Sequence, residues 1–395
     1  MLERPMSKAG WTRVAFGDVV HLSKARAAAP EAAGYERVVG LEHIDPGDLR
    51  IRRWGDIANG TTFTSVFKPG QVLFGKRRAY QRKVAVADFE GVCSGDIYVL
   101  EPANDRLKPE LLPFLCQTDA FFDHAVGTSA GSLSPRTNWS SLASFEFLLP
   151  PIQEQARLVE ALSAQRASIE SLQAANEQFS ILSAAFIAQV LSRTDDAAQG
   201  IKVADLLIDG PTNGRSPAPS DREAGFKTVS ISAVRYGVFD PEGCIKFVEM
   251  ATEEAVPFTV RSGDIFAIRG NGNRDLCGRV GISRETYADL VYPDLLIRMR
   301  FDQTQILPDF VVAQWNHPAV HGKLISRAKS SNGIWKVNGQ DIRAHKLVVP
   351  PIEVQQEAVQ FLAALGTQNS VVESRLAQLR EIQKQLFKAI SGDAE

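Results

Sequence analysis

Cysteine is scarce in this sequence: Cys93, Cys116, Cys244 and Cys277 are scattered among 395 residues with no CxxC pair. So few thiols exclude a disulfide framework and a zinc ribbon. Long hydrophobic runs are missing too, because no stretch approaches the roughly 18 consecutive apolar residues of a membrane span. The first residues also contain no apolar segment of the kind found in secretion signals. We therefore predict a cytoplasmic protein that does not act on a membrane.

An excess of charge of one sign is also absent. The sequence has 44 basic and 46 acidic residues and a net charge of -2, which excludes a uniformly basic coat for nucleic acid but allows local basic patches. With 44% hydrophobic residues, a chain of this length can form more than one core. We expect two or three domains.

The motifs of common enzyme classes are missing as well. Gly70–Lys76 matches a phosphate-binding loop only up to Arg77, where a magnesium-binding hydroxyl is required. Residues 270–275 match a dinucleotide fingerprint only to its second glycine. His317 and His321 lack an intervening glutamate and a third ligand, so we interpret them as solvated or capping residues. With no Asn/Asp-Pro-Pro-aromatic loop, acid-x-Lys pair or Gly-x-Ser-x-Gly turn either, the chain is predicted to be non-catalytic, with no cofactor or metal of its own.

What the sequence does contain is an internal repeat. Phe147–Gln155 reads FLLPPIQEQ and Leu347–Gln355 reads LVVPPIEVQ, 200 residues later. We infer two copies of one unit, each a domain followed by a helix. The second copy departs at residues 335–338, WKVN, which do not reproduce RTNW at 136–139. The other matching segments, in the same order, are 38–44 with 228–234, 68–74 with 261–266, and 129–133 with 330–334.

Each Pro-Pro pair is followed by about 40 residues with no proline and almost no glycine. Pro151 and Pro351 suit a first helical turn, and apolar residues then recur at helical spacing in both copies, with Asn176 and Asn369 among them. We predict two long helices that pair as a coiled coil, although each helix could instead cover its own domain. The predicted pairing residues are Val159, Leu162, Leu172, Phe179, Phe186, Val359, Leu362, Val372, Leu379 and Leu386.

The segments before the helices mix short strand-like runs with helical ones, which predicts an α+β (mixed α/β) fold. The predicted domain boundaries are 1–150 and 197–350 for the two similar domains, and 151–196 and 351–395 for the two helices. The expected strands are 71–74, 84–86, 96–100 and 295–301, and the expected short helices are 111–122 and 308–315.

Local basic patches occur at matching places in the two copies. Residues 57–87 contain six basic side chains and no acidic one, and residues 310–340 also lack an acid. We name residues 76–83 the first cationic loop and residues 269–279 the second cationic loop. Arginine, asparagine and glutamine are suited to reading base edges, and cations to holding phosphates, so both loops are candidates for DNA contact. The candidate residues are Lys76, Arg77, Arg78, Tyr80, Gln81, Arg82, Lys83, Arg269, Asn271, Asn273, Arg274, Arg279, Lys329 and Lys336.

These features together resemble the specificity (S) subunits of type I restriction-modification systems. The resemblance covers essentially the whole chain and depends on the two Pro-Pro-Ile-x-x-Gln helix starts, the glycine turns before the strands and Thr137–Trp139. It implies two target-recognition domains that each read half of a bipartite site in double-stranded DNA, and helices that pair antiparallel with pseudo-two-fold symmetry. It also implies two modification (methyltransferase) subunits as partners, which bind S-adenosylmethionine, and restriction subunits that translocate DNA.

A rival interpretation is a non-catalytic scaffold, in which duplicated domains bind protein or glycan ligands and the coiled coil sets their spacing. The two interpretations differ in an observable way. Binding to duplex DNA that weakens with salt indicates a specificity subunit, whereas salt-insensitive binding to another ligand indicates a scaffold.

Overall fold

The computed structural model describes residues 8–192, 200–221, 225–235, 237–331 and 333–391. The chain divides into unit 1, residues 1–174 with 372–395, and unit 2, residues 175–371. The predicted helix ends at 196 and 395 lie outside the described residues. Each long helix contributes one half to each unit, so the units do not coincide with a simple division of the chain at its middle.

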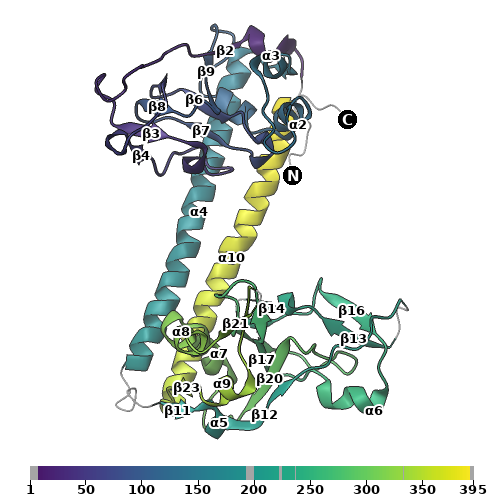
Figure 1. The fold of residues 1–395 in the computed structure, drawn as a ribbon. Helices are drawn as coiled ribbons and strands as arrows, with labels where there is room; N and C mark the ends of the chain where they lie inside the picture. Colours follow the sequence, from purple (N-terminus) through teal and green to yellow (C-terminus); the bar gives the residue numbers. More distant parts are fainter. Residues whose placement is uncertain (1–7, 193–199, 222–224, 236, 332, 392–395) are drawn as a thin grey trace. The chain divides into compact units, whose positions relative to one another are not determined.

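The two long helices are α4 (Ile152–Ser192) and α10 (Ile352–Ser391), and each begins directly after its Pro-Pro pair. In unit 1, Nε2 of Gln165 near the start of α4 donates to the carbonyl of Leu379 near the end of α10. In unit 2 the end of α4 lies against the start of α10, because the ring centroids of Phe186 in α4 and Phe361 in α10 are 4.2 Å apart. The predicted antiparallel coiled coil is therefore confirmed (Figure 1).

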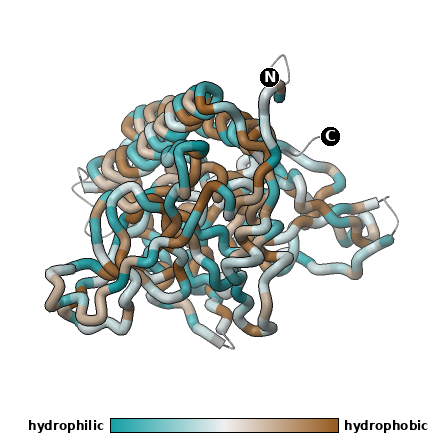
Figure 2. Tube along the Cα trace, turned by 90° about the horizontal axis from the view of Figure 1, so that it is seen from above, coloured by the Kyte–Doolittle hydropathy of each residue, from teal (hydrophilic) through white to brown (hydrophobic). Residues whose placement is uncertain are grey.

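Hydrophobic and hydrophilic residues alternate along the Cα trace of the long helices (Figure 2). Among the residues described, no helix is both long and apolar enough to cross a membrane. The apolar residues instead form stripes suited to packing against protein.

Unit 1 contains two four-stranded sheets and a two-stranded ribbon. The first sheet is antiparallel, in the order β2 (Val20–Leu22), β9 (Ile97–Pro102), β6 (Val72–Gly75) and β7 (Val84–Val86). The second has the order β4 (Gly55–Asp56), β3 (Arg37–Val39), β8 (Gly91–Cys93) and β5 (Ser65–Phe67). The ribbon pairs β1 (Thr12–Ala15) with β10 (Glu146–Leu149), which directly precedes α4.

Unit 2 repeats this plan with a larger sheet. Its six strands follow the order β12 (Leu207–Asn213), β20 (Leu296–Phe301), β17 (Ile265–Ile268), β19 (Val280–Ser283), β15 (Val238–Phe239) and β14 (Val234–Arg235). A ribbon of β11 (Ile201–Lys202) and β23 (Lys346–Leu347) matches β1 and β10. The remaining strands are β13 (Phe226–Val229) with β16 (Ile245–Val248), and β18 (Gly270–Asn271), β22 (Ile334–Lys336) and β21 (Lys329–Ser331) as a three-stranded sheet.

The helices of the domains are short. The expected helix at 308–315 is present as α7 (Pro308–Asn316), but the one at 111–122 is wrong. It is split into α1 (Leu112–Leu115) and α2 (Asp119–Gly127), because the hydroxyl of Thr118 accepts from the amide of Phe121 and starts a new helix. The other short helices are α3 (Trp139–Ala143), α5 (Val203–Leu206), α6 (Thr252–Ala255), α8 (Pro318–Ile325) and α9 (Gly339–Arg343).

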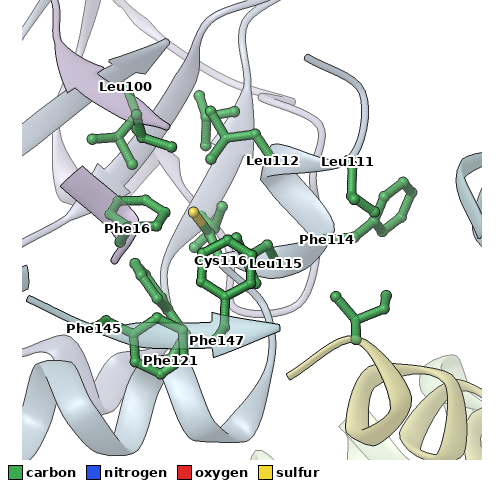
Figure 3. Close-up of a cluster of buried hydrophobic side chains, with 14 of the residues drawn as sticks. Phe16, Leu100, Leu111, Leu112, Phe114, Leu115, Cys116, Phe121, Phe145 and Phe147 are labelled. Atoms are coloured by element: carbon green, nitrogen blue, oxygen red, sulfur yellow. The ribbon is translucent and has the colours of Figure 1, made fainter. Parts of the chain in front are cut away.

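The main core of unit 1 lies between the first sheet, the short helices and the ends of the two long helices. Phe16, Leu100, Cys116 and Phe121 are fully buried in it (Figure 3). Leu158, Leu162, Leu386 and Ile390 of the long helices belong to the same cluster. In unit 2, Ile187, Val190 and Ala358 of the long helices join the core around Trp315 in the same way.

The Pro-Pro-Ile-x-x-Gln motif has one structural explanation in both copies. The Gln155 side chain is completely buried, and its Nε2 donates to the carbonyls of Arg106 and Pro150 at 2.7 and 2.8 Å, while its Oε1 accepts from the amide of Lys108 at 2.8 Å. Gln355, also completely buried, makes the matching three bonds to Gln305, Pro350 and Leu307. Each glutamine therefore connects the first turn of a long helix to a loop of the preceding domain.

Two histidines of unit 2 are buried. His345 is 2% exposed and packs on Trp315 with ring centroids 4.8 Å apart. Burial, with smaller contributions from Arg327, His321 and Lys323, lowers the pKa of His345 to about 4. Burial also lowers the pKa of His321, which bonds to the carbonyl of Cys277 and is not the solvated residue that we expected. His317 does cap a helix, as expected, by accepting from the amide of Ala319.

We expect unit 2 to lose stability as the pH falls from about 6.5 toward 4. The pKa of His345 is lower in the folded state than the usual value of about 6.5, so the unfolded chain takes up the proton first. The contribution of neutral His345 to the free energy of unfolding is complete above pH 6.5. At pH 5 this free energy of unfolding is lower by about 2 kcal/mol. Denaturant unfolding of the full chain at pH 7.5 and 5 measures this loss. A His345→Phe variant with the same pH dependence as wild type would contradict the assignment.

Candidate nucleic-acid interface

The first cationic loop connects β6 to β7 and contains one turn of 3-10 helix, Ala79–Gln81. Arg78 and Arg82 flank this turn with φ angles of 54° and 55°, in the left-handed region that non-glycine residues rarely adopt. The amide of Arg78 donates to the carbonyl of Pro135 at 2.7 Å, which supports this backbone. Tyr80 lies at the centre of the turn and is 55% exposed. The loop therefore presents Tyr80 to solvent between two arginines.

Asp96 connects the first cationic loop to the segment 129–136. Its carboxylate accepts from Arg77 at 3.1 Å and from Arg136 at 2.9 Å, and Arg77 also donates to the hydroxyl of Ser134. Although partial burial opposes it, these bonds from Arg136 and Arg77 keep the pKa of Asp96 below its usual value. Sequence reasoning missed Asp96 because its two partners are 19 and 40 residues away in the chain. Asp96 positions the loop and does not itself attract DNA.

Three other cations of this loop are engaged within unit 1. Lys76 places its Nζ 4.7 Å from the centre of the Tyr98 ring, and burial lowers the pKa of Lys76. Arg82 pairs with Asp119 and lies over Phe122, and Lys83 donates to the carbonyl of Leu41 at 2.6 Å.

Arg78 differs from these three cations. Within the described part of the chain its guanidinium has no hydrogen bond or ion pair, and its Nε is buried without a partner. Together with Tyr80 and the half-buried Gln81, it is the part of this loop with unused binding groups.

The second cationic loop connects β17 to β19. Arg269 donates to the carbonyl of Asp294 at 3.3 Å, and Arg274 lies over Trp335 at 4.9 Å. Arg279 donates to the carbonyls of Asp275 and Asn316, and burial lowers its pKa. Asn271 and Asn273 use their Oδ1 atoms as acceptors for loop amides, which leaves their Nδ2 groups available. The loop is thus held both by hydrogen bonds within itself and by bonds to Asp294 and Asn316.

The structure brings Lys329 and Lys336 to the second cationic loop. Lys336 of β22 pairs with Gly270 of β18 on one side and with Lys329 of β21 on the other. Unit 1 has the same arrangement, because Arg136 bridges to Arg77 and to Ala130. In unit 2, the residues proposed from two distant segments therefore lie in one patch of backbone, whereas in unit 1 the first cationic loop is joined by Arg136, which was not among the candidates.

Residues 335–338 differ in sequence from residues 136–139, but the two segments share one structural feature, an asparagine that caps a short helix. Asn138 caps α3 by accepting from the amide of Ser141, and Asn338, 200 residues later, caps α9 by accepting from the amides of Gln340 and Asp341. The shared residue is therefore the asparagine cap. Trp139 packs near Phe16 in the core of unit 1, whereas Trp335 lies against Arg274.

The predicted pairing residues lie in different surroundings. Leu172, Phe179, Val372 and Leu379 are half-buried along the middle of the long helices. Those near the helix ends reach the domain cores. They are Val159, Leu162 and Leu386 in unit 1, and Phe186, Val359 and Leu362 in unit 2.

The described residues contain no cluster of three or more histidine, cysteine or acidic side chains that could hold a metal ion. All four cysteines are buried and free, and burial raises the pKa of the Cys93 thiol to about 12. Such a thiol is not a nucleophile at neutral pH. The chemistry that the two patches offer is therefore hydrogen bonding and charge.

Comparisons with known proteins agree with this picture. The family model described as the type I restriction modification DNA specificity domain matches residues 9–178. The EcoKI specificity subunit of Escherichia coli (strain K12) is 27% identical over 412 residues, which cover 91% of this chain and 85% of that protein. The StySPI specificity subunit of Salmonella potsdam is 24% identical over 411 residues, with the same coverage.

Solved structures share the fold. The type I restriction-modification S subunit from M. genitalium has a TM-score of 0.56 at 14% identity, covering 98% of this chain and 97% of its own. A chain from a study of complex assembly and conformational transition of the type I R-M system has a TM-score of 0.57 at 18% identity, covering 98% and 99%. The matched DNA specificity domain and the full-length relatives agree: over 91% of its length the chain is similar to specificity subunits of type I restriction-modification systems, and it shares the fold of their solved structures.

Proposed function

We propose that this chain reads a bipartite, asymmetric site in double-stranded DNA through its two domains. The observation that carries the proposal is the duplicated patch: in each unit, a cationic loop after the matching strand lies against a second segment with a basic side chain, Arg136 in unit 1 and Lys336 in unit 2. The first patch offers Arg78, Tyr80 and Gln81, whereas the second offers Asn271, Asn273 and Arg274. Because these side chains differ, the two half-sites are expected to differ in sequence.

The same proposal includes partner subunits. The full-length relatives are named as subunits of type I restriction enzymes, so we infer that methyltransferase and restriction subunits dock on this chain. S-adenosylmethionine would then bind to the methyltransferase partner and not to this chain. With a net charge of -2, this chain neutralises few phosphates by itself, and its partners would supply much of the sequence-independent affinity for DNA.

Mapping of methylated bases tests the proposal. The chain is co-expressed with the methyltransferase subunit of its own system, and the host DNA is read by long-read sequencing. We expect one new motif with two short, unlike halves around a fixed gap. An active methyltransferase in a stable complex that leaves no new motif would contradict the proposal, and salt-insensitive binding to another ligand would then favour a scaffold.

A further inference from the structure

Leu276 is a large apolar side chain at the outer turn of the second cationic loop. It is 47% exposed, although its neighbours Asn273, Arg274 and Asp275 are polar. It also forms part of the wall of a cavity of about 720 Å³, which Ile231, Val234 and other apolar residues line. An approaching base edge would therefore meet an apolar surface at this point, surrounded by hydrogen-bonding groups.

The backbone holds Leu276 firmly in this exposed position. Its amide donates to the carbonyl of Asn273 at 3.2 Å, and its carbonyl accepts from the amide of Arg279 at 3.3 Å. The two following residues are anchored to the core, because the carbonyl of Cys277 bonds to His321 at 2.8 Å and that of Gly278 accepts from Trp315 at 3.0 Å. The main chain at Leu276 thus cannot move without breaking several hydrogen bonds.

Unit 1 has Tyr80 at the equivalent position. Gly75 donates to the carbonyl of Lys83 at 2.9 Å, and at the matching place Ile268 donates to that of Arg279, also at 2.9 Å. The residue directly before the accepting carbonyl is Arg82 in unit 1 and Gly278 in unit 2. Both have a positive φ angle, 55° for Arg82 and 73° for Gly278. Two residues earlier stand Tyr80 and Leu276, 55% and 47% exposed. Both copies therefore expose one large apolar side chain at the same point of the loop, but of different shape.

We propose that Leu276 contacts the 5-methyl group of a thymine in the second half-site. The thymine methyl is the apolar group that base pairs present in the major groove, so an exposed aliphatic side chain among arginine and asparagine complements it. This inference rests on the proposed function and adds an assignment to it: an A·T pair is read by Leu276, next to bases read by Asn271, Asn273 or Arg274. The different residue at the matching position, Tyr80, makes this contact specific to the second half-site.

Deoxyuridine is the probe, because it lacks only the methyl group of thymidine. After the half-sites have been mapped, duplexes are made with deoxyuridine at each thymidine of the second half-site in turn. Binding of the complete complex with its methyltransferase subunits is then measured. We expect one replacement to weaken wild-type binding about three- to five-fold, the effect of one buried methyl group. The Leu276→Ala variant should bind the thymidine duplex more weakly and lose the discrimination at that same position.

The matched control is Ile208→Ala, which shortens another exposed aliphatic side chain of unit 2, 70% exposed and outside the loop. It should keep the full discrimination. If no replacement affects wild type, or if Leu276→Ala keeps the wild-type discrimination, the contact is disproved while the bipartite site stands. If the complex shows no sequence-specific site at all, it is the proposed function that fails. Unchanged dependence on the other bases of the second half-site shows that unit 2 of each variant is folded.

Discussion

Replacing Gln155 with alanine is expected to destabilise unit 1 by about 3 kcal/mol, because two carbonyls and one amide would lose their partner and the carbonyl of Pro150 would be left buried without one. The side chain is 0% exposed, so water does not replace these bonds at once. Hydrogen exchange is the measurement, since the two units need not unfold together. The amide of Lys108, which donates to Gln155, should exchange roughly 100-fold faster.

Two further variants make this prediction specific. Gln153→Ala changes an exposed glutamine in the same turn and should leave the exchange of Lys108 unaltered. Gln155→Glu keeps the shape but removes the two donated bonds and buries a carboxylate, so it should be at least as harmful as alanine. Equal effects of the changes at 153 and 155 would show that the three bonds contribute little. By the same reasoning, Gln355→Ala should affect the amide of Leu307 in unit 2.

Replacing Arg78 with alanine is expected to weaken binding to the first half-site by about 10- to 100-fold, the range for loss of one good contact between arginine and guanine. Arg78 has no ion pair or hydrogen-bonded side-chain partner within the residues described, whereas Arg77 is held by Asp96 and Ser134. Arginine and alanine meet the same backbone strain at a φ of 54°, so the substitution chiefly removes the guanidinium. Competition binding with altered first half-sites, and methylation mapping, measure the loss.

Arg78→Lys separates two roles for this residue. A lysine keeps a phosphate contact but does not make the paired hydrogen bonds to guanine. The Arg78→Lys variant should therefore bind as tightly as wild type only if Arg78 holds a phosphate. Arg13→Ala is the control, because Arg13 is an exposed arginine of unit 1 outside the loop. An Arg78→Ala complex with unchanged affinity and an unchanged first half-site would exclude Arg78 from the interface.

Much of the architecture could be predicted from local patterns. The Pro-Pro pairs and the helical spacing of apolar residues indicated α4 and α10, whose starts depend on residues adjacent in the chain. The strand expected at 84–86 is β7, and the one expected at 295–301 is β20 to within a residue. The helix expected at 111–122 failed because Thr118, which interrupts it, has no effect on apolar periodicity.

The candidate site could be predicted only in outline. The density of basic residues in 57–87 was visible in the sequence. The sequence did not show which of these side chains are free to contact DNA and which are bound to other parts of the protein. Lys83 is engaged by the carbonyl of Leu41, 42 residues away, and Arg82 by Asp119, 37 residues away. Leu276 carried no signal in the sequence, because a single leucine near polar residues is ordinary until its exposure is known.

The sequence by itself determined the repeat, the two long helices and the places where basic residues gather, because these depend on spacing along one segment. Only the tertiary structure decided the antiparallel pairing within each unit, the joining of each cationic loop to a second segment with a basic side chain, and the three bonds of Gln155 and Gln355. The physical reason is distance along the chain. Backbone pairing and buried hydrogen bonds join residues that are tens or hundreds of positions apart, and local composition does not record which partners meet.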